Sequence, residues 1–220
     1  MLKNYIISLL MLLSASSTAL SAQELSARDT LQQRLSNLDT FQSAFVQDVR
    51  SASGKLLQQA SGTLSIAKPT YLDWQVIEPD ETRLLSKDDV VYLIDPFLEQ
   101  VSIYDLGKMI ENNPLLLLLS DDVNQWENFS VVQQNQNNDK IFEVSAKSPN
   151  AIIQALTLKF ADEVLLSMSF VDTQQQVSTF VFHDAKINVV LPADTFSYIV
   201  PDTYTIDDQR AIDVPNKNRP

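Results

Sequence analysis

The chain has 220 residues, with 16 basic and 28 acidic side chains, one histidine, three glycines and no cysteine. The missing cysteines exclude disulfides, zinc–thiolate centres and iron–sulfur clusters, and the three isolated glycines leave no glycine-rich phosphate loop. A net charge of −12 argues against a nucleic-acid-binding face, and a hydrophobic content of 45% is that of a globular protein.

The first 22 residues have the layout of a secretory signal peptide. Lys3 supplies the positive start, residues 5–13 form an apolar run, and small residues follow. The run is shorter than the roughly 20 residues that span a bilayer. We predict cleavage after Ala19, Ser21 or Ala22 and export to the bacterial periplasm; a retained anchor or a buried helix is the alternative.

After cleavage of the signal peptide, we predict that the mature chain forms one domain, which is long enough to bury a sizeable hydrophobic core. No cysteine follows the apolar run, so the chain is not itself an N-terminally lipidated lipoprotein. Without residues 1–22 the net charge becomes −13, because only Lys3 is lost. We expect the domain to occupy residues 23–210 and the polar tail, 211–220, to be mobile.

A helix is predicted over residues 26–38. Ser26-Ala27-Arg28-Asp29 has the spacing of a capping box, and Leu31, Leu35 and Leu38 recur at helical spacing.

Strands are predicted for most of the remaining chain. Residues 41–49 fit a helix face or a strand, and the turn-like residues 51–54 after them favour a strand and hairpin. From residue 56 to 104, apolar and polar residues alternate, which predicts an antiparallel meander. Strands resume at about Phe129, with alternation at, for example, Leu166, Met168 and Phe170.

The segment 106–119 interrupts the strands. Asn113 and Pro114 suit the cap and the first turn of a helix, and leucines occupy 115–119. We predict two short helices here; the leucines fit a lid or a buried core helix equally. Pattern alone thus predicts a mainly β domain, a large antiparallel sheet or barrel with helices over one face, which suits a container for lipid or another ligand.

The residues offer no catalytic constellation. His183 lies in a strand-like stretch, and no Gly-x-Ser-x-Gly elbow exists to partner it. The acidic pairs Asp88-Asp89 and Asp121-Asp122 lie at predicted turns and fit solvated acids. We predict that the chain is not an enzyme and has no metal site and no cofactor; a hydrolase on a β scaffold is the alternative.

Several short motifs follow one another along the mature chain. They are Phe41-Gln42-Ser43-Ala44-Phe45-Val46-Gln47, Gly62-Thr63-Leu64, Lys68-Pro69, Trp74, Pro79-Asp80-Glu81, Asp95-Pro96-Phe97-Leu98-Glu99-Gln100, Asn113-Pro114, Val200-Pro201-Asp202 and Ile206-Asp207-Asp208-Gln209-Arg210. In this order, behind a signal peptide, they resemble the outer-membrane lipoprotein carrier (LolA) family over nearly the whole mature chain.

The resemblance implies a fold and a function. The fold is an unclosed antiparallel β-barrel, a strongly curved sheet, with a helical lid covering an apolar cavity. The function is that of a periplasmic chaperone, a monomer, which takes lipoproteins released by an inner-membrane LolCDE-type ABC transporter, shelters their acyl chains, and passes them to the outer-membrane acceptor LolB. That acceptor is lipidated through an N-terminal cysteine, which this chain lacks. A periplasmic binding module for another lipid or glycolipid is the alternative.

On the implied fold, two groups of apolar residues are predicted to form the site, unless they are ordinary core residues. The acyl-chain cavity is assigned to Leu64, Ile66, Leu72, Trp74, Leu93, Phe160, Met168 and Phe170. The lid is assigned to Leu31, Leu35, Met109, Ile110, Leu115 and Leu118.

Lys68 departs from the family pattern. The family commonly has arginine directly before the proline of the strand turn, where it hydrogen-bonds to the lid. We predict that Lys68 is the lid latch and donates to carbonyls of residues 105–119, without the planar fork of arginine. A solvated turn lysine is the alternative.

Overall fold

The computed structural model describes residues 25–110, 119, 123–149, 151 and 153–210. The predicted signal peptide and the predicted mobile tail lie outside these residues. In chain order the described elements are α1 (Ala27–Ser36), β1 (Thr40–Arg50), β2 (Leu56–Ala67), β3 (Tyr71–Glu78), β4 (Thr82–Lys87), β5 (Val90–Asp95), β6 (Gln100–Asp105), α2 (Leu106–Ile110), the 3₁₀ helix η2 (Val123–Asn128), β7 (Phe129–Gln136), β8 (Asp139–Ala146), β9 (Ile153–Ala161), β10 (Val164–Asp172), β11 (Val177–Ile187) and β12 (Thr205–Asp208).

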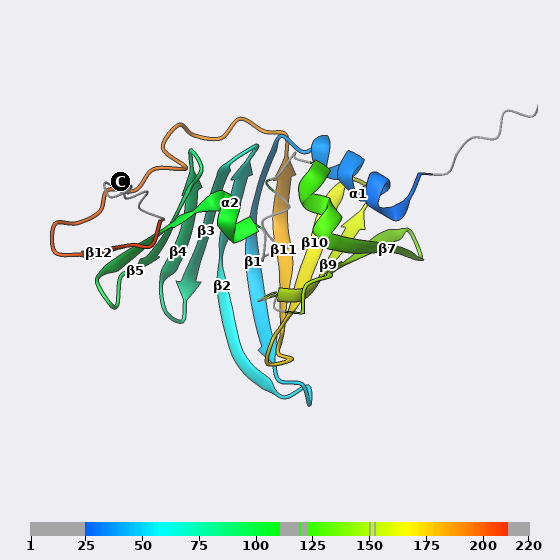
Figure 1. Cartoon of the computed structure of the whole chain (residues 1–220), viewed down its shortest axis with the longest axis horizontal. Coiled ribbons are helices and arrows are strands. Elements are labelled where there is room, and N and C mark those ends of the chain that lie inside the picture. Colours follow the sequence, from blue (N-terminus) through cyan, green and yellow to red (C-terminus); the bar gives the residue numbers. More distant parts are fainter. Residues whose placement is uncertain (1–24, 111–118, 120–122, 150, 152, 211–220) are drawn as a thin grey trace, which may run out of the picture.

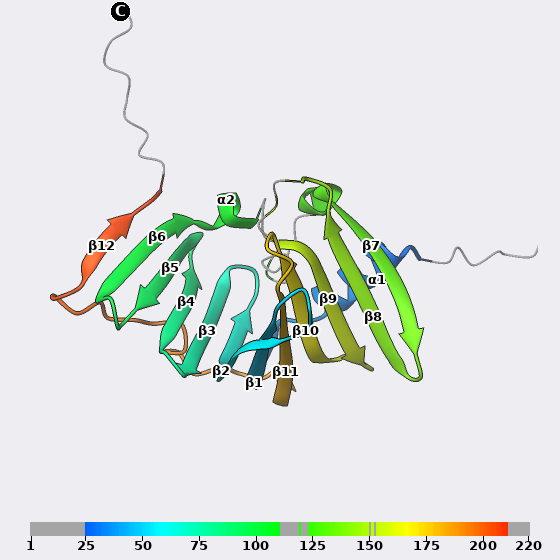
Figure 2. The same cartoon turned by 90° about the horizontal axis from the view of Figure 1, so that it is seen from below.

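The twelve described strands form one curved sheet in the order β12-β6-β5-β4-β3-β2-β1-β11-β10-β9-β8-β7. The sheet arches over without closing, and β12 and β7 remain at its two ends (Figure 2). The prediction of a mainly β, unclosed, curved sheet is therefore confirmed.

The prediction that the sheet is entirely antiparallel is wrong at β12. This strand runs parallel to β6, with Thr205 opposite Gln100 and Asp208 opposite Ile103. The cause lies in residues 188–204, which follow β11 and run along the sheet to its β6 edge (Figure 1). There β12 begins beside the start of β6. A long crossover of this kind can produce either strand direction, whereas tight hairpins produce only antiparallel pairs.

The predicted helix over 26–38 is confirmed as α1, and residues 41–49 form a strand, β1. Ser26 is the N-cap: its Oγ accepts a hydrogen bond from the Asp29 backbone N–H at 3.1 Å. Of the two helices predicted over 106–119, α2 is present, and the second falls on residues outside the described ones.

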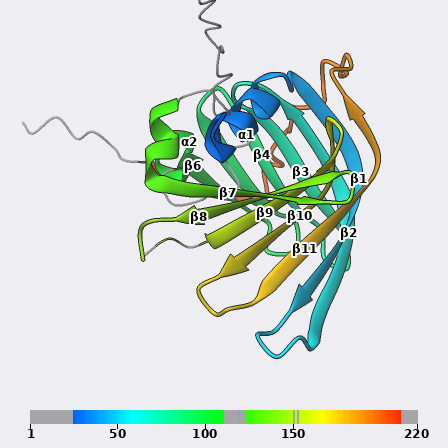
Figure 3. The same ribbon diagram turned by 90° about the vertical axis from the view of Figure 1, so that its right-hand side faces the viewer.

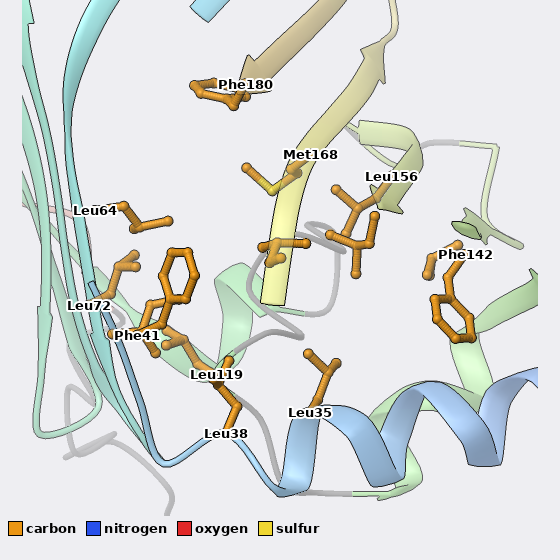
Figure 4. Packing of buried hydrophobic residues seen from close by; sticks show 14 of the residues in the cluster. Leu35, Leu38, Phe41, Leu64, Leu72, Leu119, Phe142, Leu156, Met168 and Phe180 are labelled. Atoms are coloured by element: carbon orange, nitrogen blue, oxygen red, sulfur yellow. The ribbon is translucent and has the colours of Figure 1, made fainter. Parts of the chain in front are cut away.

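The main core lies between α1 and the inner, concave face of the sheet. Figure 4 shows Leu35 at the end of α1 pointing toward the strands, and Leu38 and Leu119 lying close to Phe41 of β1. All four side chains are at most 8% exposed. Figure 3 shows α1 and α2 at one end of the curled sheet, away from the β1–β2 turn.

A second, smaller core lies on the outer face. Leu85, Ile94 and Val101 are buried there against Phe196 and Tyr198 from residues 188–204, which we call the strap. Burial raises the pKa of Tyr198 above its ordinary value, and its hydrogen bond with Tyr204 adds to the shift.

The strap is also tied to the sheet by Arg83. Its guanidinium forms an ion pair with Asp73 at 2.6 Å, donates to the Thr195 carbonyl at 3.1 Å, and stands 5.7 Å from the ring centre of Tyr198. The strap therefore covers the outer face of β3–β6 with contacts that are apolar and charged at once.

Gly62 permits the close approach of β2 to its neighbours on the inner face. A Cβ built on Gly62 would meet the Gln75 backbone oxygen far inside van der Waals contact and would lie 2.8 Å from Cζ of Phe45. The register of β2 against β3 shifts between Ser61 and Gly62, so the glycine lies at a bulge.

Gly62→Ala is expected to lower the free energy of unfolding by about 1–3 kcal/mol, because strand backbone or the Phe45 ring must move. Urea unfolding of the purified protein measures the change. Gly107→Ala is the matched control: the nearest atom to its added Cβ is Oδ1 of Asp105 at 3.3 Å. Its effect should stay within about 1 kcal/mol. Equal stability of Gly62→Ala and the unchanged protein would contradict this account.

Candidate functional site

Four aromatic side chains from four strands meet on the inner face. Phe45 lies 5.4 Å from Phe180 and 5.8 Å from Trp74, measured between ring centres. Trp74 and Phe180 are 4.8 Å apart, and Phe170 stacks on Phe180 at 5.8 Å. Phe45 and Phe180 are buried, whereas Trp74 and Phe170 are partly exposed. The rings thus form an apolar wall that begins in the core and reaches solvent.

The wall continues across β4 and β5. Leu84 lies opposite Trp74, and Leu93 lies opposite Leu84. Leu93 shares the inner face with Val91, because alternate residues of a strand point to the same side. Val91 is fully buried, whereas Leu93 is 41% exposed. Leu93 of β5 is therefore exposed to solvent on the part of the inner face toward β6, where no described helix covers it.

The other residues predicted for the cavity gather in the same apolar cluster. Those that are at most 4% exposed are Leu64, Ile66, Leu72, Phe160 and Met168. Their burial fits a core role as well as a wall against which a ligand lies. Trp74, Phe170 and Leu93 are the predicted cavity residues that solvent reaches, so they are the direct candidates for contact with a ligand.

The predicted lid residues are only partly within the described chain. Leu31 and Leu35 of α1 are buried in the cluster, and Met109 of α2 packs against it. Ile110 ends α2, and Leu115 and Leu118 lie outside the described residues. Leu119, one of the five leucines predicted to form a lid or a buried core helix, is 1% exposed within the cluster.

Two arginines of α1 fasten this helix to the sheet. Nη2 of Arg28 donates to the Phe129 carbonyl at 2.8 Å. Nη1 of Arg34 donates to the Asp162 carbonyl at the β9–β10 turn and lies 3.2 Å from a carboxylate oxygen of Glu163. The Arg34 guanidinium also stands 5.1 Å from the ring centre of Phe160, while its buried Nε has no acceptor among the described residues.

These anchors were not predicted. Arg34 occurs between leucines at helical spacing, and a single sequence gives no sign that a charged residue beside the apolar side of a helix will reach a turn 128 positions away. Its 9% exposure sets it apart from the ordinary surface arginine.

Lys68, the predicted latch, follows β2 near the helical end of the sheet. Its backbone N–H donates to the Asp39 carbonyl at 3.0 Å. Of its predicted partners, residues 105–119, only 105–110 and 119 are described, so the latch stays a prediction.

Two cavities lined by described residues lie on the outer face. One, of about 530 Å³, is lined by Val46, Gln59, Ala60, Ser61, Glu78 and Pro79. The other, of about 360 Å³, lies beneath the strap and is lined by Leu85, Lys87, Tyr92, Phe196, Ser197, Tyr198 and Val200.

Within the described parts of the chain, no three histidine, aspartate or glutamate side chains are grouped as metal ligands. His183 is exposed on the outer face, opposite Ala44. Among the described helices, none has the length and apolar character needed to cross a membrane.

Comparison with known proteins gives one family. The sequence model of the family described as outer membrane lipoprotein carrier protein LolA matches residues 36–199. The outer-membrane lipoprotein carrier protein of Pseudoalteromonas translucida (strain TAC 125) is 35% identical over 182 residues, which are 81% of this chain and 86% of the relative. That of Proteus mirabilis (strain HI4320) is 33% identical over 187 residues, 84% and 89% of the two chains.

One solved structure supports the fold alone. An uncharacterized conserved protein from Thermus thermophilus superimposes with a TM-score of 0.51 at 14% sequence identity, over 84% of this chain and all of the other.

Proposed function

Because the chain belongs to the outer-membrane lipoprotein carrier (LolA) family, we propose that its inner apolar face shelters the acyl chains of a lipoprotein during transport. Family membership makes the chain a periplasmic carrier of lipoproteins bound for the outer membrane, and not an enzyme. The observation that carries the proposal is the aromatic wall, whose outer members Trp74 and Phe170 stay partly exposed on the concave side.

The physical need for a carrier follows from the cost of exposing lipid. Each methylene of an acyl chain is worth about 0.8 kcal/mol of hydrophobic free energy. A protein that carries several long chains therefore cannot cross an aqueous compartment unaided. A concave face lined with aromatic and aliphatic side chains replaces the membrane as the apolar surroundings.

Release of the lipoprotein requires that the inner face does not bind the acyl chains too tightly. Met109 and Met168 are flexible side chains that adapt to acyl chains of different length and shape. If α1 and α2 lie against the inner face when it is empty, they compete with the cargo for the same surface, and net affinity falls. The arginine anchors of α1 contribute to the stability of that empty state.

The partners follow from the same role. We propose that an inner-membrane LolCDE-type ABC transporter supplies the cargo and that the outer-membrane acceptor LolB receives it. The carrier works between them as a monomer.

Release of lipoproteins from spheroplasts tests the function. Adding the purified mature protein should move newly made lipoproteins into the soluble fraction, and omitting it should leave them in the inner membrane. Mass spectrometry of lipid that co-purifies with the protein is the accompanying measurement. Retention of lipoproteins in both samples, with a glycolipid or other lipid bound to the protein, would favour the alternative binding module.

Trp74→Glu should impair transport more than folding. The substitution places a carboxylate on the inner face, where an acyl chain would have to bury it, so affinity for a fluorescent acyl probe should fall at least about tenfold. Thr63→Glu adds the same charge on the exposed outer face of the neighbouring strand and should bind the probe normally. Normal probe affinity in a folded Trp74→Glu protein would exclude Trp74 from the acyl-binding wall.

Lys68→Leu should raise the apparent affinity for the acyl probe and slow transfer to LolB, because weakening a competing closed state favours the ligand-bound one. Lys68→Arg should do the reverse, since its fork adds donors toward the lid. Probe displacement and transfer are measured on all three proteins. Identical values across the series would leave the lid held by apolar packing and the α1 arginines alone.

A further inference from the structure

A glutamine interrupts the apolar inner face beside the aromatic wall. Gln47 takes the next inward position of β1 after Phe45, because alternate residues of a strand share a face and no register shift separates the two. The pairing agrees: Gln47 lies opposite Phe180 of β11 on one side and Ala60 of β2 on the other. Its half-buried amide therefore stands at the edge of the wall, next to a buried ring.

A serine adds a second polar group on the neighbouring strand. Ser178 of β11 lies opposite Phe170 of β10 and Val49 of β1, and it is 8% exposed. Neither the Gln47 amide nor the Ser178 hydroxyl forms a side-chain hydrogen bond with a described residue. Two hydrogen-bond donors thus face the inner side of the sheet next to aromatic rings, and no described part of the chain satisfies them.

An acyl chain laid over this part of the wall excludes water from both groups. A polar group buried without a hydrogen bond costs free energy, so a plain hydrocarbon is penalised here. One end of an acyl chain is not plain hydrocarbon, because its first carbon is a carbonyl, joined to the rest of the cargo as an ester or an amide. The carbonyl oxygen accepts hydrogen bonds, and the Gln47 amide and the Ser178 hydroxyl can each donate one.

The direction of the chain follows from the length of the inner face on each side of Gln47. Toward the turn, β1 ends at the exposed Arg50, about 10 Å away at roughly 3.3 Å per residue. Toward the helical end, Phe41 is about 20 Å away by the same spacing. Acyl chains of one membrane leaflet occupy roughly 15 Å, half of the hydrocarbon core. Only the helical direction has that length, and Figure 4 shows Phe41 beside Leu38 at that end, with Phe180 farther from α1.

We propose that Gln47 and Ser178 bind the carbonyl ends of the acyl chains and so fix the orientation of the cargo, with the hydrocarbon running toward α1 and α2. This inference rests on the proposed function, since that function places acyl chains on the inner face. The two donors make the site selective for acyl esters and amides over hydrocarbon of the same length. The polypeptide attached at the carbonyl end then leaves the protein near Phe170, at the end of the sheet that carries the β1–β2 turn.

The test compares two soluble lipopeptides on the purified mature protein. One carries two acyl chains as glyceryl esters, and the other carries alkyl chains of the same length as glyceryl ethers, which lack the carbonyl. Measured by displacement of a fluorescent acyl probe, the ester peptide should bind about tenfold more tightly, the effect of two hydrogen bonds of ordinary net strength. Gln47→Met and Ser178→Ala should each reduce this ratio to about threefold, and the double variant should abolish it.

Gln75→Met is the matched control. Gln75 follows Trp74 on β3 and points to the outer face, where its amide donates to a carboxylate oxygen of Glu81 at 3.1 Å. Its replacement should leave the ratio of ester to ether affinity unchanged. A change in stability alone shifts the affinities for both lipopeptides together, so the ratio reports the contact with the carbonyl and not the state of the fold.

Nitroxide-labelled lipopeptides test the orientation on the unaltered chain by NMR. A nitroxide on the residue next to the glyceryl group should broaden the side-chain amide signals of Gln47 more than the methyl signals of Ile66, which lies opposite Phe41 near the helical end. A nitroxide at the methyl end of an acyl chain should broaden the Ile66 signals more. The opposite pattern, or the same order with both labels, would overturn the proposed orientation.

The outcomes separate the two proposals. If neither lipopeptide displaces the probe, the proposed function itself is overturned. If both displace it with equal affinity, or if the preference for the ester survives in the double variant, only the carbonyl site is overturned, and the inner face then binds acyl chains through apolar contacts alone.

Discussion

The apolar inner face of the sheet has to be kept from water, and the placement of the other elements follows from that requirement. A sheet that closed completely would bury this face permanently, and a flat one would expose it. The twelve described strands instead form an arch, and α1 and α2 cover one end of it. Trp74, Phe170 and Leu93 lie where cover is incomplete. Under the proposed function, this incompletely covered part of the inner face is what a transported acyl chain binds.

Both faces of the sheet carry apolar packing, the larger core on the inner face and a smaller one on the outer face. On the outer face the strap buries Leu85, Ile94 and Val101, and its Thr195 carbonyl accepts a hydrogen bond from Arg83. These contacts hold β3–β6 in place from the outer face. The inner side of the same strands is thereby free to carry half-exposed apolar residues without loss of order. The strap core thus adds stability to β3–β6 from the outer face, in addition to the main core on the inner face.

Sequence alone predicted the parts that depend on local pattern. Alternation identified the strands, the Ser26 cap identified the start of α1, and the motifs of the family indicated the curved, open sheet. Long-range features were less accessible. The predicted alternation of Leu166, Met168 and Phe170 breaks at its first residue, because the register shifts between Leu165 and Ser167 and Leu165 is the buried residue. A bulge inserts one residue without a compositional sign.

The same limit applies to the site. The predicted cavity residues share one face because strand periodicity determines which side a residue takes. Their exposure depends on what lies over them: Phe160 is covered by Arg34 of α1, whereas no described helix covers Leu93. The parallel direction of β12 and the arginine anchors depend on partners distant in sequence, which periodicity cannot identify.

The anchors of α1 have a consequence for how the protein tolerates mutation. Arg28 and Arg34 donate to main-chain oxygens, those of Phe129 and Asp162. Every amino acid supplies such an oxygen, so a substitution at either acceptor position leaves the acceptor in place. For these two hydrogen bonds, only the arginines themselves are sensitive, so the bonds depend on two codons rather than four. The contacts of α1 that do depend on side chains are those of the buried Leu31 and Leu35 and those of Arg34 with Glu163 and Phe160.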